Sequence, residues 1–162
     1  MKGRLLIFCG IPASGKTTIA RVVCEKLQRA ILVQTDAVRG MLGHPSFRAE
    51  ESKFVYGACN ALAREALREG YTVLLDGTFM REEYRSEARN SLQKYYGRVD
   101  VVHVECRLDT ALRRNASRRA RIPAEKVRSI YERFEAPRRA LRIDSARMRS
   151  RDAGNLIVES LF

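Results

Sequence analysis

Apolar runs and amphipathic stretches alternate along the chain. Five short apolar runs, each typical of a buried strand, cover residues 5–9, 31–36, 71–76, 99–106 and 155–160. Between them, apolar residues recur at helical spacing across about residues 15–29, 46–69, 81–96, 109–121 and 124–140. Strands that alternate with helices predict an α/β fold, with a central parallel sheet of about five strands and helices on both faces.

The chain is predicted to form one domain, residues 1–162, without repeat, low-complexity segment or linker. Its 162 residues can bury a substantial core, and 45% of them are hydrophobic. No apolar run approaches the ~18 residues of a membrane span, and the N-terminus lacks the features of a signal peptide. The four cysteines form no C-x-x-C pair, which favours free thiols over a metal site. We therefore expect a cytoplasmic protein without a membrane partner, and His103 is expected to be a packed strand histidine.

The first apolar run ends at a glycine that opens the sequence GIPASGKTT, residues 10–18. This sequence matches G-x-x-x-x-G-K-[ST] between a predicted strand and a predicted helix, which is the context the pattern requires. Backbone N–H groups of such a loop converge on phosphate, and the helix N-terminus adds its dipole. Lys16 can reach the β- and γ-phosphates, and the Thr17 hydroxyl can ligate Mg²⁺. The predicted nucleotide-binding residues of this loop are Gly10, Ala13, Ser14, Gly15, Lys16, Thr17 and Thr18.

The second and third apolar runs each end in a carboxylate. In a parallel sheet, ligands gather beyond the carboxyl ends of the strands, so these positions are where chemistry is expected. Asp36 is placed for a general base that faces the γ-phosphate, with Arg39 one helical turn later to steady it or to hold an anionic acceptor. The alternative is that Thr35 or Asp36 caps a short helix. Asp76 is expected to orient Mg²⁺ through water or to hold Arg39, although Asp-Gly is also an ordinary turn dipeptide.

An arginine-rich stretch follows the fourth apolar run, with Asp109 as a plausible N-cap for its helix. Arg114 and Arg118 are four residues apart, and on one helix face they could close over polyphosphate and neutralise charge on the transferred group. The alternative is a solvated basic helix. We expect a helical arginine lid, about residues 107–124, that ATP orders.

These motifs together resemble the P-loop kinases grouped around the 5′-hydroxyl polynucleotide kinases, a group related to gluconate, antibiotic and zeta-toxin-type kinases. The resemblance runs from Leu5 to about Pro137 and rests on GIPASGKTT, T-D-x-x-R, VLLDGTF and R-x-x-x-R. It implies that the loop holds ATP and Mg²⁺, that the aspartate after the second strand activates the acceptor hydroxyl, that the nearby arginine contacts the acceptor phosphate, and that the lid arginines clamp the donor. By resemblance these roles fall on Lys16, Thr17, Asp36, Arg39, Arg114 and Arg118. Lys16, Asp36 and Arg118 are the predicted catalytic residues, and Thr17 and Asp76 the predicted metal site.

The acceptor is less well specified by these motifs than the transfer itself. The chain has 31 basic and 19 acidic residues, a net charge of +12, which favours a polyanionic partner, although a preference for arginine can also reflect genome composition or heat adaptation. The first expectation is the 5′-hydroxyl of a nucleic acid, with Arg81 and Arg85 extending a phosphate-binding track and Phe47 or Tyr56 either stacking on a base or packing in the core. The alternatives are a small hydroxyl substrate (a sugar, an antibiotic or a nucleotide) and a nucleotide-binding regulatory module. ATP or GTP as donor and the oligomeric state stay open.

Overall fold

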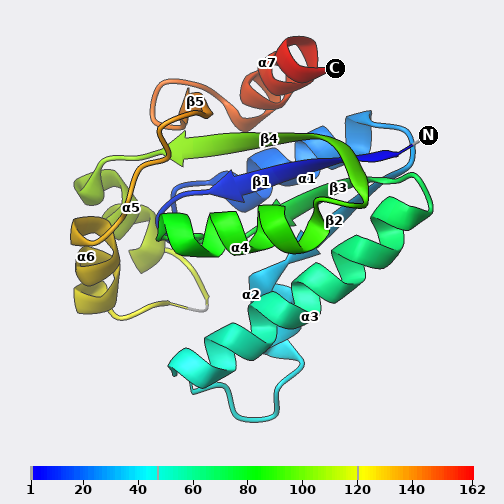
Figure 1. Ribbon diagram of the computed structural model, residues 1–162. Helices are drawn as coiled ribbons and strands as arrows, with labels where there is room; N and C mark the ends of the chain where they lie inside the picture. The colour runs from blue at the N-terminus through cyan, green and yellow to red at the C-terminus, as the bar shows by residue number, and fades with distance from the viewer. Residues whose placement is uncertain (1, 47, 120) are drawn as a thin grey trace.

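A five-stranded parallel sheet forms the centre of the molecule (Figure 1). The computed structural model describes residues 2–46, 48–119 and 121–162. The strand order is β2-β3-β1-β4-β5, and every pair of neighbours is parallel. The strands are β1 (Gly3–Cys9), β2 (Ala30–Gln34), β3 (Thr72–Asp76), β4 (Tyr96–Glu105) and β5 (Leu141–Asp144).

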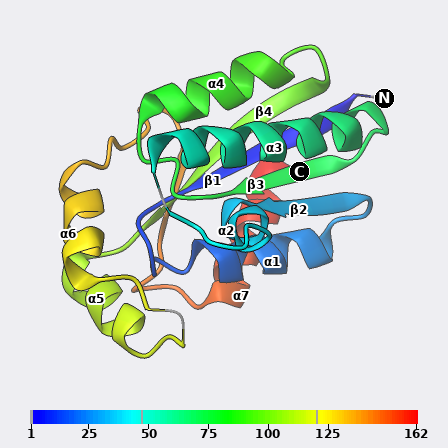
Figure 2. The same ribbon diagram turned by 90° about the horizontal axis from the view of Figure 1, so that it is seen from below.

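Helices cover both faces of this sheet, as Figure 2 shows from below. They are α1 (Lys16–Lys26), α2 (Thr35–Gly40), α3 (Ala49–Arg68), α4 (Glu82–Leu92), α5 (Leu108–Ala116), α6 (Ala124–Glu132) and α7 (Ser150–Leu161). Side chains alternate between the two faces of a strand, and β1 divides its residues accordingly. Leu5 and Ile7 pack in one core with α3 and α4, whereas Leu6 and Phe8 pack in a second core with α1 and α7. The predicted α/β fold is confirmed.

Helix α5, which lies in the predicted lid of about residues 107–124, and helix α6, which follows it, lie together beyond the carboxyl end of β4 (Figure 1); we call these two the lid helices. A small third core joins them to the phosphate loop through Ile11, Ala111 and Val127, each no more than 5% exposed. The chain then returns from α6 to β5 through residues 133–140. The lid helices therefore lie at the carboxyl end of the strands, where the phosphate loop also lies.

The fifth strand was predicted at the wrong place. Residues 155–160 belong to α7, and the edge strand is β5, Leu141–Asp144. In α7, Ala153 and Ile157 are four residues apart and both fully buried against α1, which is helical spacing. The segment 155–160 is apolar enough to suggest a strand, whereas the four residues of β5 include an arginine and an aspartate. Within the described residues, no helix is both long and apolar enough to cross a membrane.

Candidate active site

The phosphate loop connects β1 to α1 through backbone conformations that small residues tolerate. Ala13 and Gly15 have φ angles of 62° and 92°. Gly10 passes close to β4, where a Cβ atom would lie 2.5 Å from the carbonyl oxygen of Val104. The N–H of Gly10 donates to the Thr78 carbonyl at 3.2 Å, which ties the loop to the segment after β3. The structure therefore forms the predicted loop at the end of a buried strand, in the context its motif requires.

Lys16 is the first residue of α1, and its side chain is folded into this loop. It is 8% exposed, and its Nζ donates to the Ile11 carbonyl at 3.3 Å. Burial lowers the pKa of Lys16, the carboxylates of Asp76 and Asp36 oppose that change, and Arg118 adds to it. Three charged groups from separate segments therefore act on the Lys16 ammonium group.

Thr17 and Asp76 form the candidate magnesium site. The Thr17 hydroxyl donates to Asp76 Oδ2 at 2.6 Å, and Gln34 Nε2 donates to the same oxygen at 3.1 Å. Asp76 is 3% exposed, and its other oxygen, Oδ1, is buried without a hydrogen-bond partner among the described residues. Because the Thr17 hydroxyl uses its proton toward Asp76, its lone pairs are left for a cation. A hydroxyl and an unsatisfied carboxylate oxygen fit a hydrated Mg²⁺ bound together with phosphate.

Asp36 and Arg39 lie on α2, which follows β2 directly. β2 ends at Gln34, and α2 begins at Thr35 without a side-chain hydrogen bond at its N-cap, so the capping alternative for Thr35 and Asp36 is wrong. Asp36 is exposed and close enough to raise the pKa of Lys16. Arg39 is ion-paired with Glu51 and donates to the Ser52 hydroxyl at 3.3 Å. Arg39 is thus held by α3, whereas Asp76 is held by Thr17 and Gln34.

Arg114 comes from α5 and contacts the phosphate loop. Its guanidinium donates to the carbonyl oxygens of Ser14, at 3.3 Å, and Ser145, at 2.8 Å, and to the Ser145 hydroxyl at 3.0 Å. Arg118 was expected on the same helix face, but α5 ends at Ala116, so that geometry is wrong. Arg118 nevertheless lies near Lys16, whose pKa it lowers.

The start of α5 also differs from the prediction. Asp109 was expected as the N-cap, but the N-cap is Arg107, and the helix starts at Leu108. Asp109 Oδ1 instead accepts the N–H of Thr110 at 2.7 Å within the first turn. The helix thus begins two residues earlier than an N-cap at Asp109 implies, which places the acidic group in its first turn, where the helix dipole favours a negative charge.

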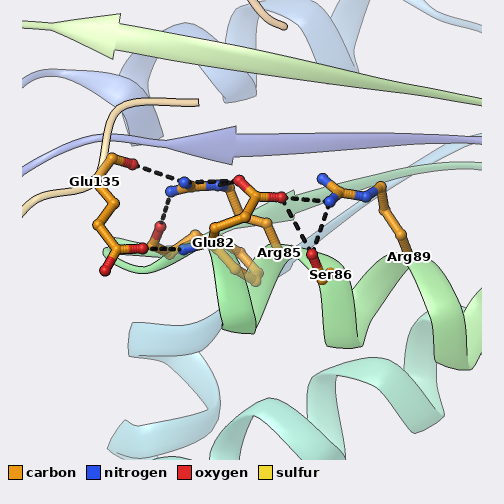
Figure 3. A network of polar contacts seen from close by, with 6 residues as sticks. Glu82, Arg85, Ser86, Arg89 and Glu135 are labelled. Atoms are coloured by element: carbon orange, nitrogen blue, oxygen red, sulfur yellow. Dashed lines mark hydrogen bonds and ion pairs between the residues drawn. The ribbon is translucent and has the colours of Figure 1, made fainter. Parts of the chain in front are cut away.

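Arg85 does not belong to a phosphate track, which corrects the prediction made for it. Its side chain is 0% exposed and points from α4 toward the segment that returns from α6 (Figure 3). It donates to the carbonyls of Phe79 and Glu135, each at 2.6 Å, and pairs with Glu82 at 2.9 Å. A guanidinium with these three partners is fully occupied inside the protein. Arg81, the N-cap of α4, is exposed, and its predicted role stays a prediction.

The remaining aromatic, histidine and cysteine predictions have separate outcomes. Tyr56 packs between Phe79 and Tyr84, with ring centroids 5.0 and 5.1 Å away, and burial raises its pKa to about 12, so it is a packing residue. Phe47 lies outside the described residues. His103 is a packed strand histidine, as predicted, stacked on Phe134. The four cysteines are free thiols, and no group of three or more metal-ligating side chains occurs in the described part of the chain.

Comparison with known proteins assigns the chain to a family. A family model described as an AAA domain matches residues 5–137, from β1 through the lid. The chain belongs to this family. A curated relative of this AAA-domain chain is the L-seryl-tRNA(Sec) kinase of Methanococcus maripaludis, 26% identical over 137 residues, which are 82% of this chain and 53% of the relative. The chain thus spans about half the length of the curated relative it matches.

Solved structures share the fold of this AAA-domain chain. The APS kinase of Mycobacterium tuberculosis, in complex with AMPPNP and APS, superposes with a TM-score of 0.81 at 18% identity over 99% of this chain and 98% of that one. A putative kinase from Chloroflexus aurantiacus gives 0.79 at 20% identity and covers both chains fully. The expected link to polynucleotide kinases is more distant. A chain of the Pnkp1/Rnl/Hen1 RNA repair complex gives 0.68 at 18% identity, over 83% of this chain and 47% of that one.

Three polar residues of the AAA domain that hold the site were missed by sequence reasoning. Gln34 is the last residue of β2, so the strand-end argument that selected Asp36 could have found it two positions earlier. Ser145 follows β5 directly, and the misplaced fifth strand hid it. Glu51 holds Arg39 from α3, and nothing in the spacing of the two residues predicts that pair.

Proposed function

We propose that this protein is a phosphotransferase that moves the γ-phosphate of ATP to a hydroxyl acceptor, with Mg²⁺ bound at Thr17 and Asp76. The observation that carries the proposal is the phosphate loop with Lys16 buried in it, the Thr17 hydroxyl 2.6 Å from Asp76 Oδ2, and the exposed Asp36 near enough to act on the pKa of Lys16. A module that only binds a nucleotide has no use for an exposed carboxylate in that position. The family membership, and relatives whose names describe kinases of seryl-tRNA and APS, support the same class of reaction.

Each residue has a distinct role in the proposed reaction. Asp36 accepts the proton of the acceptor hydroxyl as its oxygen forms a bond to the γ-phosphorus. The bond from that phosphorus to the β–γ bridging oxygen breaks, and ADP leaves with the electron pair. Lys16 and Arg118 stabilise the negative charge that develops on the transferred group. Mg²⁺, when bound, neutralises phosphate charge and aligns the donor oxygens.

For the acceptor we propose a hydroxyl carried by a nucleic acid, with its 5′-hydroxyl as the first candidate. The net charge of +12 supports a polyanionic partner, and the curated relative's name describes a substrate linked to tRNA. The second candidate is a small hydroxyl compound. The burial of Arg85 favours it, because this arginine was expected to hold polynucleotide phosphates.

The test is transfer of labelled γ-phosphate from ATP to a panel of acceptors. The panel contains 5′-hydroxyl DNA and RNA oligomers, aminoacylated tRNA, nucleosides, sugars and aminoglycosides. We expect labelled product from at least one hydroxyl acceptor and none after removal of Mg²⁺ with a chelator. Labelled inorganic phosphate alone, with every acceptor, would refute transfer to a hydroxyl.

A further inference from the structure

The positive charge of the protein is concentrated in the lid and the segment that follows it. Residues 107–140 contain eleven basic and four acidic residues, so 34 residues carry +7 of the net charge of +12. The other 128 residues carry the remaining +5. A compositional preference for arginine would spread the charge along the whole chain. The uneven distribution therefore points to a local role for it.

Nucleotide binding uses only a small part of this charge. Arg114 and Arg118 are the lid arginines near the phosphate loop. Seven other arginines of the lid and the return segment are exposed, and within the described part of the chain none of them forms an ion pair. They are Arg113, Arg119, Arg121, Arg128, Arg133, Arg138 and Arg139. Positive groups this dense along one segment of the chain repel each other, and an anionic partner relieves that repulsion.

An exposed aromatic ring lies within this basic region. Tyr131, on α6, is 43% exposed and borders two hollows. One hollow, of about 360 Å³, extends from Tyr131 past Phe134 to Ile11 of the phosphate loop. The other, of about 680 Å³, is open and includes Arg107 and Arg128. The side chain of Arg107 is 83% exposed and pairs with the exposed Asp109 at 3.4 Å, a surface contact that a phosphate can replace. Tyr131 therefore lies between a path to the phosphate loop and a pair of exposed guanidinium groups.

We infer that this lid surface binds single-stranded nucleic acid, with a base stacked on Tyr131 and neighbouring backbone phosphates on Arg107 and Arg128. Aromatic rings beside arginines are the usual means of holding single strands without reading their sequence, because every base has a π-face. The inference rests on the proposed function in one respect. The proposed reaction needs an acceptor at the phosphate loop, and this lid surface is the part of the protein that brings the acceptor there. Figure 1 shows α5 and α6 together at the end of the sheet where that loop lies.

The test is binding of a 3′-fluorescein-labelled, 5′-hydroxyl RNA 12-mer by fluorescence anisotropy, without ATP, at several salt concentrations. We expect saturable binding at low salt. Arg128→Ala should make the slope of log affinity against log salt shallower by about 0.7, the contribution of one single-strand phosphate. Tyr131→Ala should weaken binding about fivefold or more, the loss of one stacked base. Tyr131→Phe should bind like wild type because it keeps the ring.

The matched control is the double variant Lys26→Ala/Lys94→Ala, which removes two exposed positive charges, one in the last turn of α1 and one just after α4. We expect it to bind nearly as wild type does. Absence of saturable binding at low salt, or equal losses in the control and in Arg128→Ala, would overturn the inference. Tyr131-dependent binding to vesicles of anionic lipid, without binding to the RNA, would overturn it in favour of a membrane surface. Since no ATP is present, each of these results leaves the proposed phosphotransfer untouched.

Discussion

The hydroxyl of Thr17 donates to Asp76 Oδ2 across 2.6 Å, which joins the first turn of α1 to the end of β3. The turn that leads from β1 into α1 lies beside the end of β3 because β1 and β3 are neighbouring parallel strands, with Phe8 opposite Asp76 in the register. The hydrogen bond occupies Asp76 Oδ2, whereas Asp76 Oδ1 has no hydrogen-bond partner among the described residues. The sheet order therefore creates the candidate metal site.

Asp76→Asn should weaken the use of Mg²⁺. The amide keeps the shape of the carboxylate but carries no charge to hold a hydrated cation or to orient the Thr17 hydroxyl. We expect the Mg²⁺ concentration for half-maximal activity to rise by about 10–100-fold, the usual effect of losing such an outer partner. Titration of Mg²⁺ at fixed ATP measures it. An unchanged Mg²⁺ requirement would exclude Asp76 from the metal site.

Lys16→Met should abolish ATP binding without destabilising the ATP-free protein. Burial lowers the pKa of Lys16 below its value in the unfolded chain, so between the two values the unfolded state binds more protons and stability rises with pH. Below the pKa that Lys16 has in the unfolded chain, its burial therefore opposes folding. We expect a melting temperature equal to or above that of wild type and no increase on addition of ATP and Mg²⁺. Lys26→Ala, an exposed lysine at the other end of α1, should keep the ATP-induced increase.

Acidification should destabilise the protein partly through His103. Burial lowers the pKa of His103, Glu105 opposes that change, and Arg142 and Arg85 add to it. The folded-state pKa thus lies below the unfolded value, so the contribution of neutral His103 is complete above about pH 6.5 and is lost as the pH falls below it. His103→Gln should flatten stability against pH in that window. The measurement is the free energy of unfolding in denaturant at several pH values between 7 and 5. An equal decrease in wild type and in His103→Gln would contradict this prediction.

Arg85→Leu should destabilise the fold. The substitution removes the donor to the Phe79 and Glu135 carbonyls, and each buried acceptor left unsatisfied costs about 1–3 kcal/mol. We expect a loss of about 2–4 kcal/mol in the free energy of unfolding. The control is Arg89→Leu, which breaks a contact to the same Glu82 from a side chain that is 29% exposed, and it should cost far less. Equal losses in urea unfolding would show that the burial of Arg85 carries no special stability.

The sequence predicted those features that depend on local patterns. The phosphate loop and four of the five strands follow from the apolar runs and the residues that end them. Thr17 and Asp76, predicted together as the metal site, are in hydrogen-bond contact. The errors arose where distant segments decide the outcome. β5 is a strand because it pairs with β4, not because of its own composition. Arg85 donates to the carbonyl of Glu135, fifty residues later, and no sequence spacing predicts a contact over that distance.

The proposed reaction depends most directly on Asp36, and one kinetic comparison tests it. Asp36→Asn keeps the size of the side chain but accepts no proton, so kcat for the acceptor found in the panel should fall by roughly 10²–10⁴-fold. KM for ATP should stay near the wild-type value. The control Glu25→Gln makes the same chemical change at an exposed position near the C-terminal end of α1 and should leave both constants unchanged. Wild-type kcat in Asp36→Asn would contradict the assignment of the base, and with it the mechanism proposed for this protein.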